Sequence, residues 1–134
     1  MKILIMGLPG SGKTTLAKNL WKGIPDSIWY NADEVRKKYD DWDFSITGRE
    51  RQAIRMSSLC DPNKIVICDF VAPTDRLRTI FKADYLIWMD TILEGRFADT
   101  NMLFESPIKY SLRIENFKYS IKDIINSIMD YTKE

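Results

Sequence analysis

The sequence predicts one α/β domain, in which an open and mostly parallel β-sheet carries helices on both faces in a three-layer α/β/α arrangement. Short apolar segments of strand character alternate along the chain with segments whose apolar residues recur at helical spacing. One segment, Ile65–Cys68, is apolar at every position, which is typical of a strand buried on both faces of a parallel sheet. The length of 134 residues fits a single domain over residues 1–134, and 45% hydrophobic with 29% charged residues excludes disordered and fibrous classes.

The first four elements are expected to alternate between strand and helix. Lys2–Met6 is a short β-rich run that stops at a glycine, and we expect it to be the first strand. Lys13–Lys22 follows with apolar residues at helical spacing and is predicted to be a helix. Ser27–Asn31 is a candidate for the second strand, and Ala32–Tyr39 for a short polar helix.

A third helix is expected to begin at Thr47-Gly48-Arg49-Glu50, which has the form of a capping box. In such a box the Thr hydroxyl accepts from the third helical N–H and the Glu side chain reaches back to the cap. We expect this helix to run to about Cys60 and to end before the turn-forming Asp61-Pro62-Asn63.

The second half of the chain continues the alternation. Ile65–Cys68 is the buried strand, and Pro73–Lys82 is predicted as a helix because a first helical turn tolerates the missing N–H of proline. Tyr85–Met89 is a further apolar strand, and Tyr110–Ile114 is a candidate for a last short one. Apolar residues between Ile121 and Met129 fall on one face of a helix, which we expect to cover the sheet.

Composition and charge exclude several classes of protein. Lys and Arg number 20 against 19 Asp and Glu, and the net charge of +1 argues against a nucleic-acid or membrane-surface binder. The chain has no histidine, so Ser-His-Asp triads and His-ligated zinc are excluded. Cys60 and Cys68 are its only cysteines, and Ile3–Met6 is too short for a membrane span or an export signal. Two reduced thiols and a cytoplasmic location are therefore expected.

Residues Gly7–Thr14 read Gly-Leu-Pro-Gly-Ser-Gly-Lys-Thr and match the pattern G-x-x-x-x-G-K-[ST] at every fixed position. Glycines let the backbone curl so that successive N–H groups face phosphate oxygens, and the following helix adds the positive end of its dipole. The lysine supplies a charge for the β- and γ-phosphates, and the threonine a hydroxyl for Mg²⁺. The motif predicts a P-loop NTPase-type fold that binds ATP and Mg²⁺ through Gly7, Pro9, Gly10, Ser11, Gly12, Lys13, Thr14 and Thr15.

Among P-loop proteins the sequence favours a small-molecule kinase. Regulatory GTPases read guanine through Asn-Lys-x-Asp after an apolar strand, whereas Asn63-Lys64-Ile65-Val66 precedes the strand and lacks the Asp. Large motor and assembly ATPases need a longer chain. Phosphoryl transfer depends on alignment and charge neutralisation, so a kinase should offer arginines and a carboxylate around its acceptor.

Two carboxylates follow predicted strands, at the edge of the sheet where ligands bind. Asp33 comes just after Ser27–Asn31 and would orient the acceptor hydroxyl or a metal-bound water. Its alternative role is to stabilise the helix N-terminus. Asp69 follows Ile65–Cys68 and would hold a metal-bound water opposite the P-loop threonine, or else cap a turn. Both alternatives stay open at this level.

Arginines and an aromatic residue gather on the same side. Arg36 would pair with an anionic acceptor, and Arg49, Gln52 and Arg55 recur at a spacing that places them on one helix face. Arginine suits phosphate or sulfate because its guanidinium donates two parallel hydrogen bonds. Phe44 precedes them and would stack on a base. The alternative is that Phe44 packs in the core and the arginines are solvated.

At these positions the sequence resembles the adenylylsulfate kinases (APS kinases), over most of the chain. The P-loop resembles the family's Gly-Leu-Ser-Gly loop, and Asn31–Arg36 resembles its Asp-Gly-Asp-Asn-Val-Arg segment. Further segments resemble family motifs in the same order, namely Asp43–Ser45 (Gly-Phe-Ser), Val71–Pro73 (Ile-Ser-Pro), Asp90–Leu93 (Asp-Thr-Pro-Leu), Phe97–Asn101 (Phe-Thr-Gly-Ile-Asp) and Phe104–Pro107 (Tyr-Glu-Ala-Pro). This ordered set is far more specific than a P-loop, which many families share.

The resemblance implies transfer of the ATP γ-phosphate to the 3′-hydroxyl of adenosine 5′-phosphosulfate (APS), with Mg²⁺. It implies that Phe44 and Phe97 sandwich the acceptor's adenine and that Asp33 is the base or metal partner. The implied acceptor-binding residues are Asp33, Arg36, Phe44, Arg49, Gln52 and Phe97. Together, the P-loop motif, the strand-end carboxylates and the resemblance predict Lys13, Asp33 and Arg36 as catalytic residues and Thr14, Asp33 and Asp69 as the metal site. Family members often dimerise, and the sequence leaves a monomer and a homodimer both open.

Four features depart from the family pattern. Asn31 stands where the family has its first Asp, and Gln52 where it has Asn. Ala72 replaces a Ser, which excludes a covalent route through that position. The family's basic lid segment is missing, because only Glu94-Gly95-Arg96 separates Leu93 from Phe97. A lid excludes water and supplies charge, so we expect slow turnover or a substitute among Arg76, Arg78 and Arg96.

Two other functions stay open on the sequence. One is a P-loop kinase with a different acceptor, such as a nucleoside, a nucleotide or a nucleic-acid end. The other is a non-catalytic nucleotide-binding module, which the presence of Lys13, Thr14, Asp33 and Arg36 argues against. Packing in the core is expected for Cys68 and for Trp21, Trp29, Trp42 and Trp88.

Overall fold

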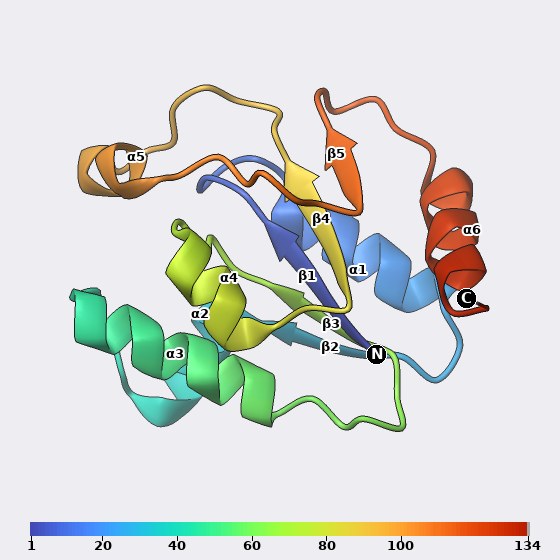
Figure 1. Ribbon diagram of the computed structural model, residues 1–134, viewed down its shortest axis with the longest axis horizontal. Coiled ribbons are helices and arrows are strands. Elements are labelled where there is room, and N and C mark those ends of the chain that lie inside the picture. Colours follow the sequence, from blue (N-terminus) through green and yellow to red (C-terminus); the bar gives the residue numbers. More distant parts are fainter. Residues whose placement is uncertain (134) are drawn as a thin grey trace.

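The computed structural model, which describes residues 1–133, has three layers with a β-sheet in the middle (Figure 1). Its strands are β1 (Lys2–Met6), β2 (Ile28–Asn31), β3 (Val66–Asp69), β4 (Tyr85–Met89) and β5 (Leu112–Ile114). They lie in the order β2-β3-β1-β4-β5, and every pairing is parallel. The predicted α/β fold class is confirmed.

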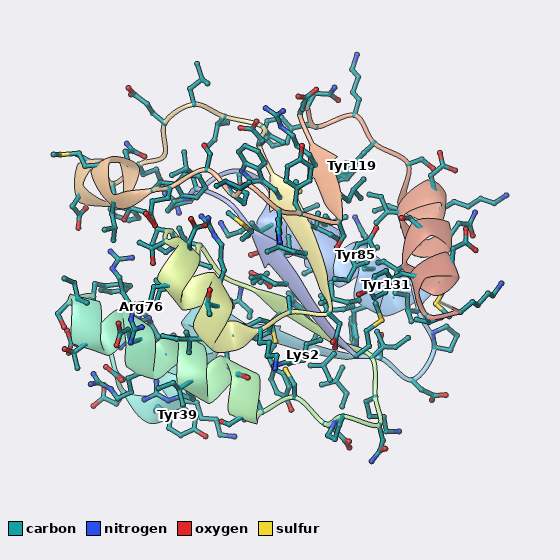
Figure 2. All side chains as sticks on the ribbon, in the orientation of Figure 1. Lys2, Tyr39, Arg76, Tyr85, Tyr119 and Tyr131 are labelled. Carbon is teal, nitrogen blue, oxygen red and sulfur yellow. The ribbon has the colours of Figure 1, made fainter. Side chains whose placement is uncertain are left out.

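Helices cover both faces of the sheet. On one face lie α1 (Lys13–Gly23) and α6 (Ile121–Tyr131), and on the other lie α2 (Ala32–Tyr39), α3 (Ile46–Ser58) and α4 (Asp75–Phe81), with short α5 (Ala98–Leu103) standing apart (Figure 1). The core is divided accordingly, with Leu20 and Ile128 buried on the first side and Val35 and Met56 on the second. Tyr85 of β4 packs edge-on against Tyr131 of α6, with ring centres 5.4 Å apart (Figure 2). The C-terminal helix covers the sheet as predicted.

The strand register brings the candidate site residues to one edge of the sheet. Asn31 at the end of β2 pairs with Asp69 at the end of β3, and Ile5 of β1 pairs with Asp69 on its other side. The P-loop follows β1 directly. Because all strands are parallel, the P-loop, Asn31 and Asp69 meet at their carboxyl ends, where open α/β sheets bind ligands.

The capping box expected at Thr47 is wrong. Helix α3 begins at Ile46, and Ser45 is its N-cap, with the Ser45 hydroxyl accepting from the Gly48 N–H at 3.1 Å. Since Thr47 already lies inside the helix, its partner Glu50 cannot reach a cap and instead forms an ion pair with Arg76.

Other boundaries differ from the predicted ones by a few residues. Thr74 caps α4, so Pro73 precedes the cap instead of occupying the first turn. The third strand runs from Val66 to Asp69, since Asp69 still pairs with β1 and β2. The last strand is shorter than predicted, and α5 was not predicted because its six residues lack an amphipathic pattern. Within residues 1–133, no helix is long and apolar enough to cross a membrane.

Candidate functional site

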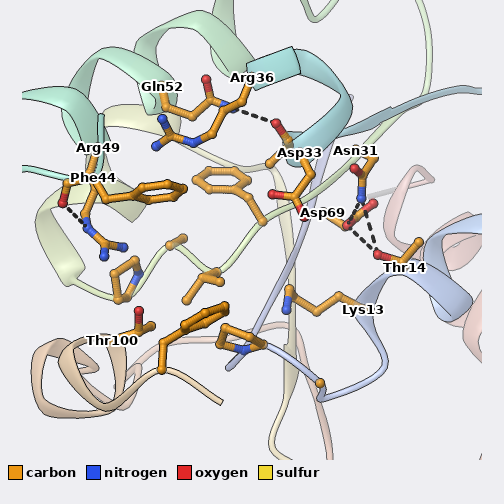
Figure 3. Close-up of a pocket in the computed structure, with 18 of the residues that line it drawn as sticks. Lys13, Thr14, Asn31, Asp33, Arg36, Phe44, Arg49, Gln52, Asp69 and Thr100 are labelled. Carbon is orange, nitrogen blue, oxygen red and sulfur yellow. Dashed lines mark hydrogen bonds between the residues drawn. The ribbon is translucent and has the colours of Figure 1, made fainter. Parts of the chain in front are cut away.

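A cavity of about 710 Å³ opens at the carboxyl ends of β1, β2 and β3 (Figure 3). The P-loop forms one wall, the starts of α2 and α3 form another, and the segment around Phe97 closes the side opposite α3. Most predicted site residues line it, namely Pro9, Gly10, Gly12, Lys13, Thr14, Thr15, Asp33, Arg36, Phe44, Arg49, Gln52, Asp69 and Phe97. Gly7 and Ser11, which were predicted to bind the nucleotide, do not line it, and both are buried.

Close packing explains why the P-loop begins with glycine. Gly7 has φ +153°, and a Cβ there would lie 2.6 Å from the Met89 carbonyl oxygen. The loop is held further by Thr91, whose hydroxyl donates to the Ser11 carbonyl at 2.7 Å. Gly12 is the N-cap of α1 and offers no side chain to the first helical N–H groups. Those N–H groups therefore remain available for an anion.

Lys13 folds back over the P-loop. Its Nζ donates to the Leu8 carbonyl at 3.0 Å, and the residue is buried. Burial lowers the pKa of Lys13 from 10.5 to about 8, although Asp69 and Asp33 nearby oppose this effect. A phosphate bound beside Lys13 would stabilise the protonated ammonium and so oppose the effect of burial on its pKa.

A hydrogen-bond network at the strand ends fixes Asp69 (Figure 3). Its Oδ1 accepts from the Thr14 hydroxyl at 3.2 Å and from the Asn31 amide at 2.9 Å, and its Oδ2 accepts from the Trp29 indole at 2.6 Å. Burial raises the pKa of Asp69, and the three hydrogen bonds counteract it. The Asn31 Oδ1 also accepts from the Glu34 N–H at 3.0 Å and so caps α2. Asn31 thus adds no second charge beside Asp69.

Trp29 was predicted from the sequence only as a core packing residue, and its contact with the site was not predicted. Trp29 is half-buried, and its indole N–H is directed at Asp69. A signal was present in the sequence, because Trp29 and Asn31 are two residues apart in a strand and share one face. Trp21 and Trp42 also depart from the expectation, since they are 43% and 50% exposed, and Trp42 lines the cavity.

The donor set at the strand ends fits Mg²⁺. The Thr14 hydroxyl and the Asp69 carboxylate lie in contact, and Asp33 is exposed at the same cavity. Within residues 1–133, no group of three His, Cys, Asp or Glu residues is arranged as a metal cage. Mg²⁺ in nucleotide sites needs few protein ligands, because it keeps waters and binds the phosphates. Thr14 and Asp69, with Asp33, would hold it here.

Arg36 is buried beneath the aromatic wall. Its guanidinium lies 4.2 Å from the centre of the Phe44 ring, and its Nη1 donates to the Asp41 carbonyl at 2.9 Å and to the Asp43 carbonyl at 3.2 Å. Burial lowers the pKa of Arg36. Arg36 therefore holds the loop that presents Phe44, in addition to lining the cavity.

The residues of α3 divide into two kinds. Arg49 points toward the cavity, and its Nε donates to the Phe44 carbonyl at 2.8 Å (Figure 3). Gln52 is 3% exposed, with its amide nitrogen bonded to the Ala32 carbonyl at 3.0 Å and its oxygen accepting from Arg55 at 2.8 Å. Arg55 does not line the cavity and pairs with Asp41. Gln52 and Arg55 thus brace the wall.

Only one of the three arginines considered as lid substitutes reaches the cavity. Arg76 is paired with Glu50, and Arg78 is buried, with its Nε donating to the Ala72 carbonyl at 2.9 Å. Arg96 is exposed, lines the cavity and lies close enough to lower the pKa of Lys13.

Backbone strain marks the segment after β3. Ala72 has φ +44° although it precedes a proline, a position that normally favours extended backbone. It is 1% exposed and lines the cavity. Such strain costs about 1–3 kcal/mol and persists where the surroundings impose it. The Arg78 bond to the Ala72 carbonyl and the buried methyl group provide that constraint.

Comparisons with known proteins agree with this geometry. The family model Adenylylsulphate kinase matches residues 1–95. No curated protein matches the chain. Its fold is similar to that of the Mycobacterium tuberculosis APS kinase in complex with AMPPNP and APS, with a TM-score of 0.78, 20% identity, and coverage of 99% of this chain and 97% of that one.

Kinases of other small molecules share the fold. Shikimate kinase from Aquifex aeolicus has a TM-score of 0.68 and 15% identity, over 99% of this chain and 96% of that one. A gluconokinase from Sinorhizobium meliloti 1021 has a TM-score of 0.65 and 11% identity, over 98% of this chain and 91% of that one. The fold is therefore that of the P-loop kinases.

Proposed function

The chain belongs to the adenylylsulphate kinase family, and on that premise we propose that it transfers the γ-phosphate of ATP to the 3′-hydroxyl of APS. One observation carries the proposal. A phosphate-binding loop, the exposed carboxylate of Asp33, the side chains of Arg49 and Arg96, and two half-exposed phenylalanines line a single cavity of about 710 Å³. That volume is within the range of sites for small molecules of nucleotide size.

Each group has a role that follows from its chemistry. The P-loop N–H groups and Lys13 would bind the β- and γ-phosphates, and Arg96 would offset the charge on the phosphoryl group in transfer. Mg²⁺ held by Thr14 and Asp69 would screen the phosphate oxygens. Asp33 would accept the proton of the acceptor hydroxyl, whose oxygen bonds to the γ-phosphorus as ADP leaves.

The acceptor side combines stacking with anion binding. Phe44 and Phe97 are 49% and 53% exposed and line the same cavity, so each presents part of its ring surface to an adenine, although Arg36 lies over the Phe44 ring and Arg96 lies near the Phe97 ring. Arg49 would pair with the phosphosulfate, while Arg36 supports Phe44 from behind. By analogy with single-strand binders, each stacked ring contributes about 1–3 kcal/mol.

The test is ADP release from Mg-ATP with APS as acceptor, beside AMP, adenosine, shikimate, gluconate and a short oligonucleotide. We expect release with APS that falls in Asp33→Ala and Arg49→Ala, while the surface variant Arg76→Ala, outside the cavity, retains it. Robust release with another acceptor and none with APS would refute the proposal. ATP binding without release from any acceptor would instead support a non-catalytic module.

A kinase with a changed acceptor is the second candidate, and the geometry of Gln52 favours it. The Gln52 side chain is 3% exposed and its amide already bonds Ala32 and Arg55, so little of it is presented to an acceptor ribose. The acceptor panel separates the two candidates directly.

Size-exclusion chromatography with light scattering tests the homodimer, which stays a prediction.

A further inference from the structure

The two cysteines of the chain are in contact beneath α3. Cys60 lies just past the end of α3, Cys68 lies in β3, and their Sγ atoms are 3.6 Å apart. Both are free thiols. A disulfide bond brings the sulfurs to about 2.05 Å, so they need to approach by roughly 1.5 Å.

The chain between the cysteines can accommodate that approach. Cys60 follows the cap of α3 at Leu59 and belongs to no strand or helix, and residues 61–64 form an exposed turn. Cys68 is fixed in the sheet and fully buried. The movement can therefore come from Cys60 and its turn, while the sheet that positions Asp69 stays in place.

Access and reactivity also differ between the two thiols. Cys60 is partly exposed, so a small reagent can reach it, whereas Cys68 is shielded. A hydrogen bond from Cys68 lowers the pKa of Cys60, and the positive charges of Lys2 and the N-terminus act in the same direction, against the effect of burial. The same contact and burial raise the pKa of Cys68. The thiolate is the attacking species in disulfide exchange, so Cys60 is suited to react first.

We propose that Cys60 and Cys68 are a reversible dithiol–disulfide pair, oxidised by small-molecule disulfides of the glutathione class. The Cys60 thiolate attacks one sulfur of the disulfide and releases the first small thiol. Cys68 then attacks Cys60 Sγ in the mixed disulfide, loses its proton and releases the second small thiol. The protein gives up two electrons and two protons, and one disulfide is reduced to two thiols.

The bond would join the segment that directly follows α3 to β3. These elements carry opposite parts of the cavity, Arg49 and Gln52 on α3 and Asp69 at the end of β3. Oxidation would therefore tie together two walls of the site at a point behind it. The proposal depends only on the two thiols and stands independently of the proposed acceptor.

The test is intact-mass analysis of the full chain after incubation with oxidised glutathione, followed by alkylation of free thiols in denaturant. We expect wild-type protein to lose both alkylation sites together and to become lighter by two hydrogen atoms, with both sites restored by dithiothreitol. In Cys68→Ser, Cys60 should instead keep one glutathionyl group. In Cys60→Ser, Cys68 should stay free and alkylatable.

Two outcomes would overturn the proposal. One is a glutathionyl group that accumulates on wild-type protein while Cys68 remains alkylatable, because Cys68 then fails to attack. The other is two thiols that both remain alkylatable while a free-cysteine reference is fully oxidised. Both outcomes are read on wild-type protein, so the test stays decisive even if a variant in the core fails to fold.

Discussion

Replacing Trp29 by Phe should destabilise the protein through one hydrogen bond to a buried carboxylate. The Trp29 indole donates to Asp69 at 2.6 Å, and Asp69 is 2% exposed. A hydrogen bond to a charged group contributes about 1.5–3 kcal/mol. For 134 residues at about 2.1 cal/mol/K each, the entropy of unfolding is about 0.28 kcal/mol/K. The thermal midpoint should therefore fall by about 5–11 °C at neutral pH.

Trp21→Phe is the matched control. Trp21 packs against Trp29 with ring centres 6.0 Å apart, and its indole has no hydrogen-bond partner among the described residues 1–133. Both substitutions remove the same atoms, so the difference in unfolding free energy contains the bond to Asp69 together with the greater burial of Trp29, since Trp21 is 43% exposed. Urea unfolding at pH 7 measures both variants. Equal losses would refute the view that the indole holds Asp69.

The pH dependence of that difference has a definite sign. Burial raises the pKa of Asp69, so above the unfolded value of about 3.9 the folded state keeps a proton that the unfolded state has lost, and stability falls as pH rises through this window. Trp29→Phe removes one hydrogen bond that keeps the pKa of Asp69 from rising further. In this variant, the pH range over which stability falls should therefore extend to higher pH. The difference from wild type should shrink in acid, where Asp69 is protonated in both proteins. A difference that is constant with pH would contradict this explanation.

Three further predictions concern the other groups of the site and fold. The pKa of Lys13 is about 8 in the free protein and should rise against phosphate, so ATP binding should take up a proton at about pH 8.5 and none near pH 6.5. Calorimetry in buffers of different ionisation enthalpy measures this uptake, and equal uptake at both pH values would contradict it. Arg96→Ala should lower kcat by roughly 10–100-fold with little change in KM, while Arg76→Ala, outside the cavity, should stay within about twofold. A similar loss in both variants would rule out a specific role for Arg96. Ser45→Ala should cost about 1 kcal/mol in urea unfolding, and Thr47→Ala less than about 0.5 kcal/mol. A larger loss of unfolding free energy in Thr47→Ala than in Ser45→Ala would indicate that Thr47 is the N-cap of α3.

Local chemistry explains why much of the fold was predictable. The P-loop needs consecutive residues only, so its presence and position follow from the pattern. The strands at Lys2–Met6 and Tyr85–Met89 and the helix at Ala32–Tyr39 have the predicted bounds. Caps were less predictable, because Ser45 and Thr47 are both acceptable to the local rule and the geometry of the loop before α3 selects Ser45.

The residues of the candidate site were predictable as a set, but the hydrogen bonds and contacts that each of them makes were not. The order of strands and helices already indicates that Asp33, Asp69 and the P-loop share one edge of the sheet. The pattern does not reveal that the Gln52 amide bonds to Ala32 and Arg55. Nor does it reveal that Arg36 packs against Phe44, or that buried Arg78 donates to the Ala72 carbonyl. These contacts join residues far apart along the chain, and competition between neighbouring donors and acceptors decides them.

The sequence by itself therefore determined the α/β class, the phosphate-binding loop and the family, because each is written in local spacing and in motif order. Only the tertiary structure decided that Trp29 completes the shell of Asp69, that Arg96 is the cavity-lining arginine of the three considered, and that Cys60 meets Cys68. The physical reason is that side-chain direction and burial depend on how helices pack on the sheet, and no single segment contains that information.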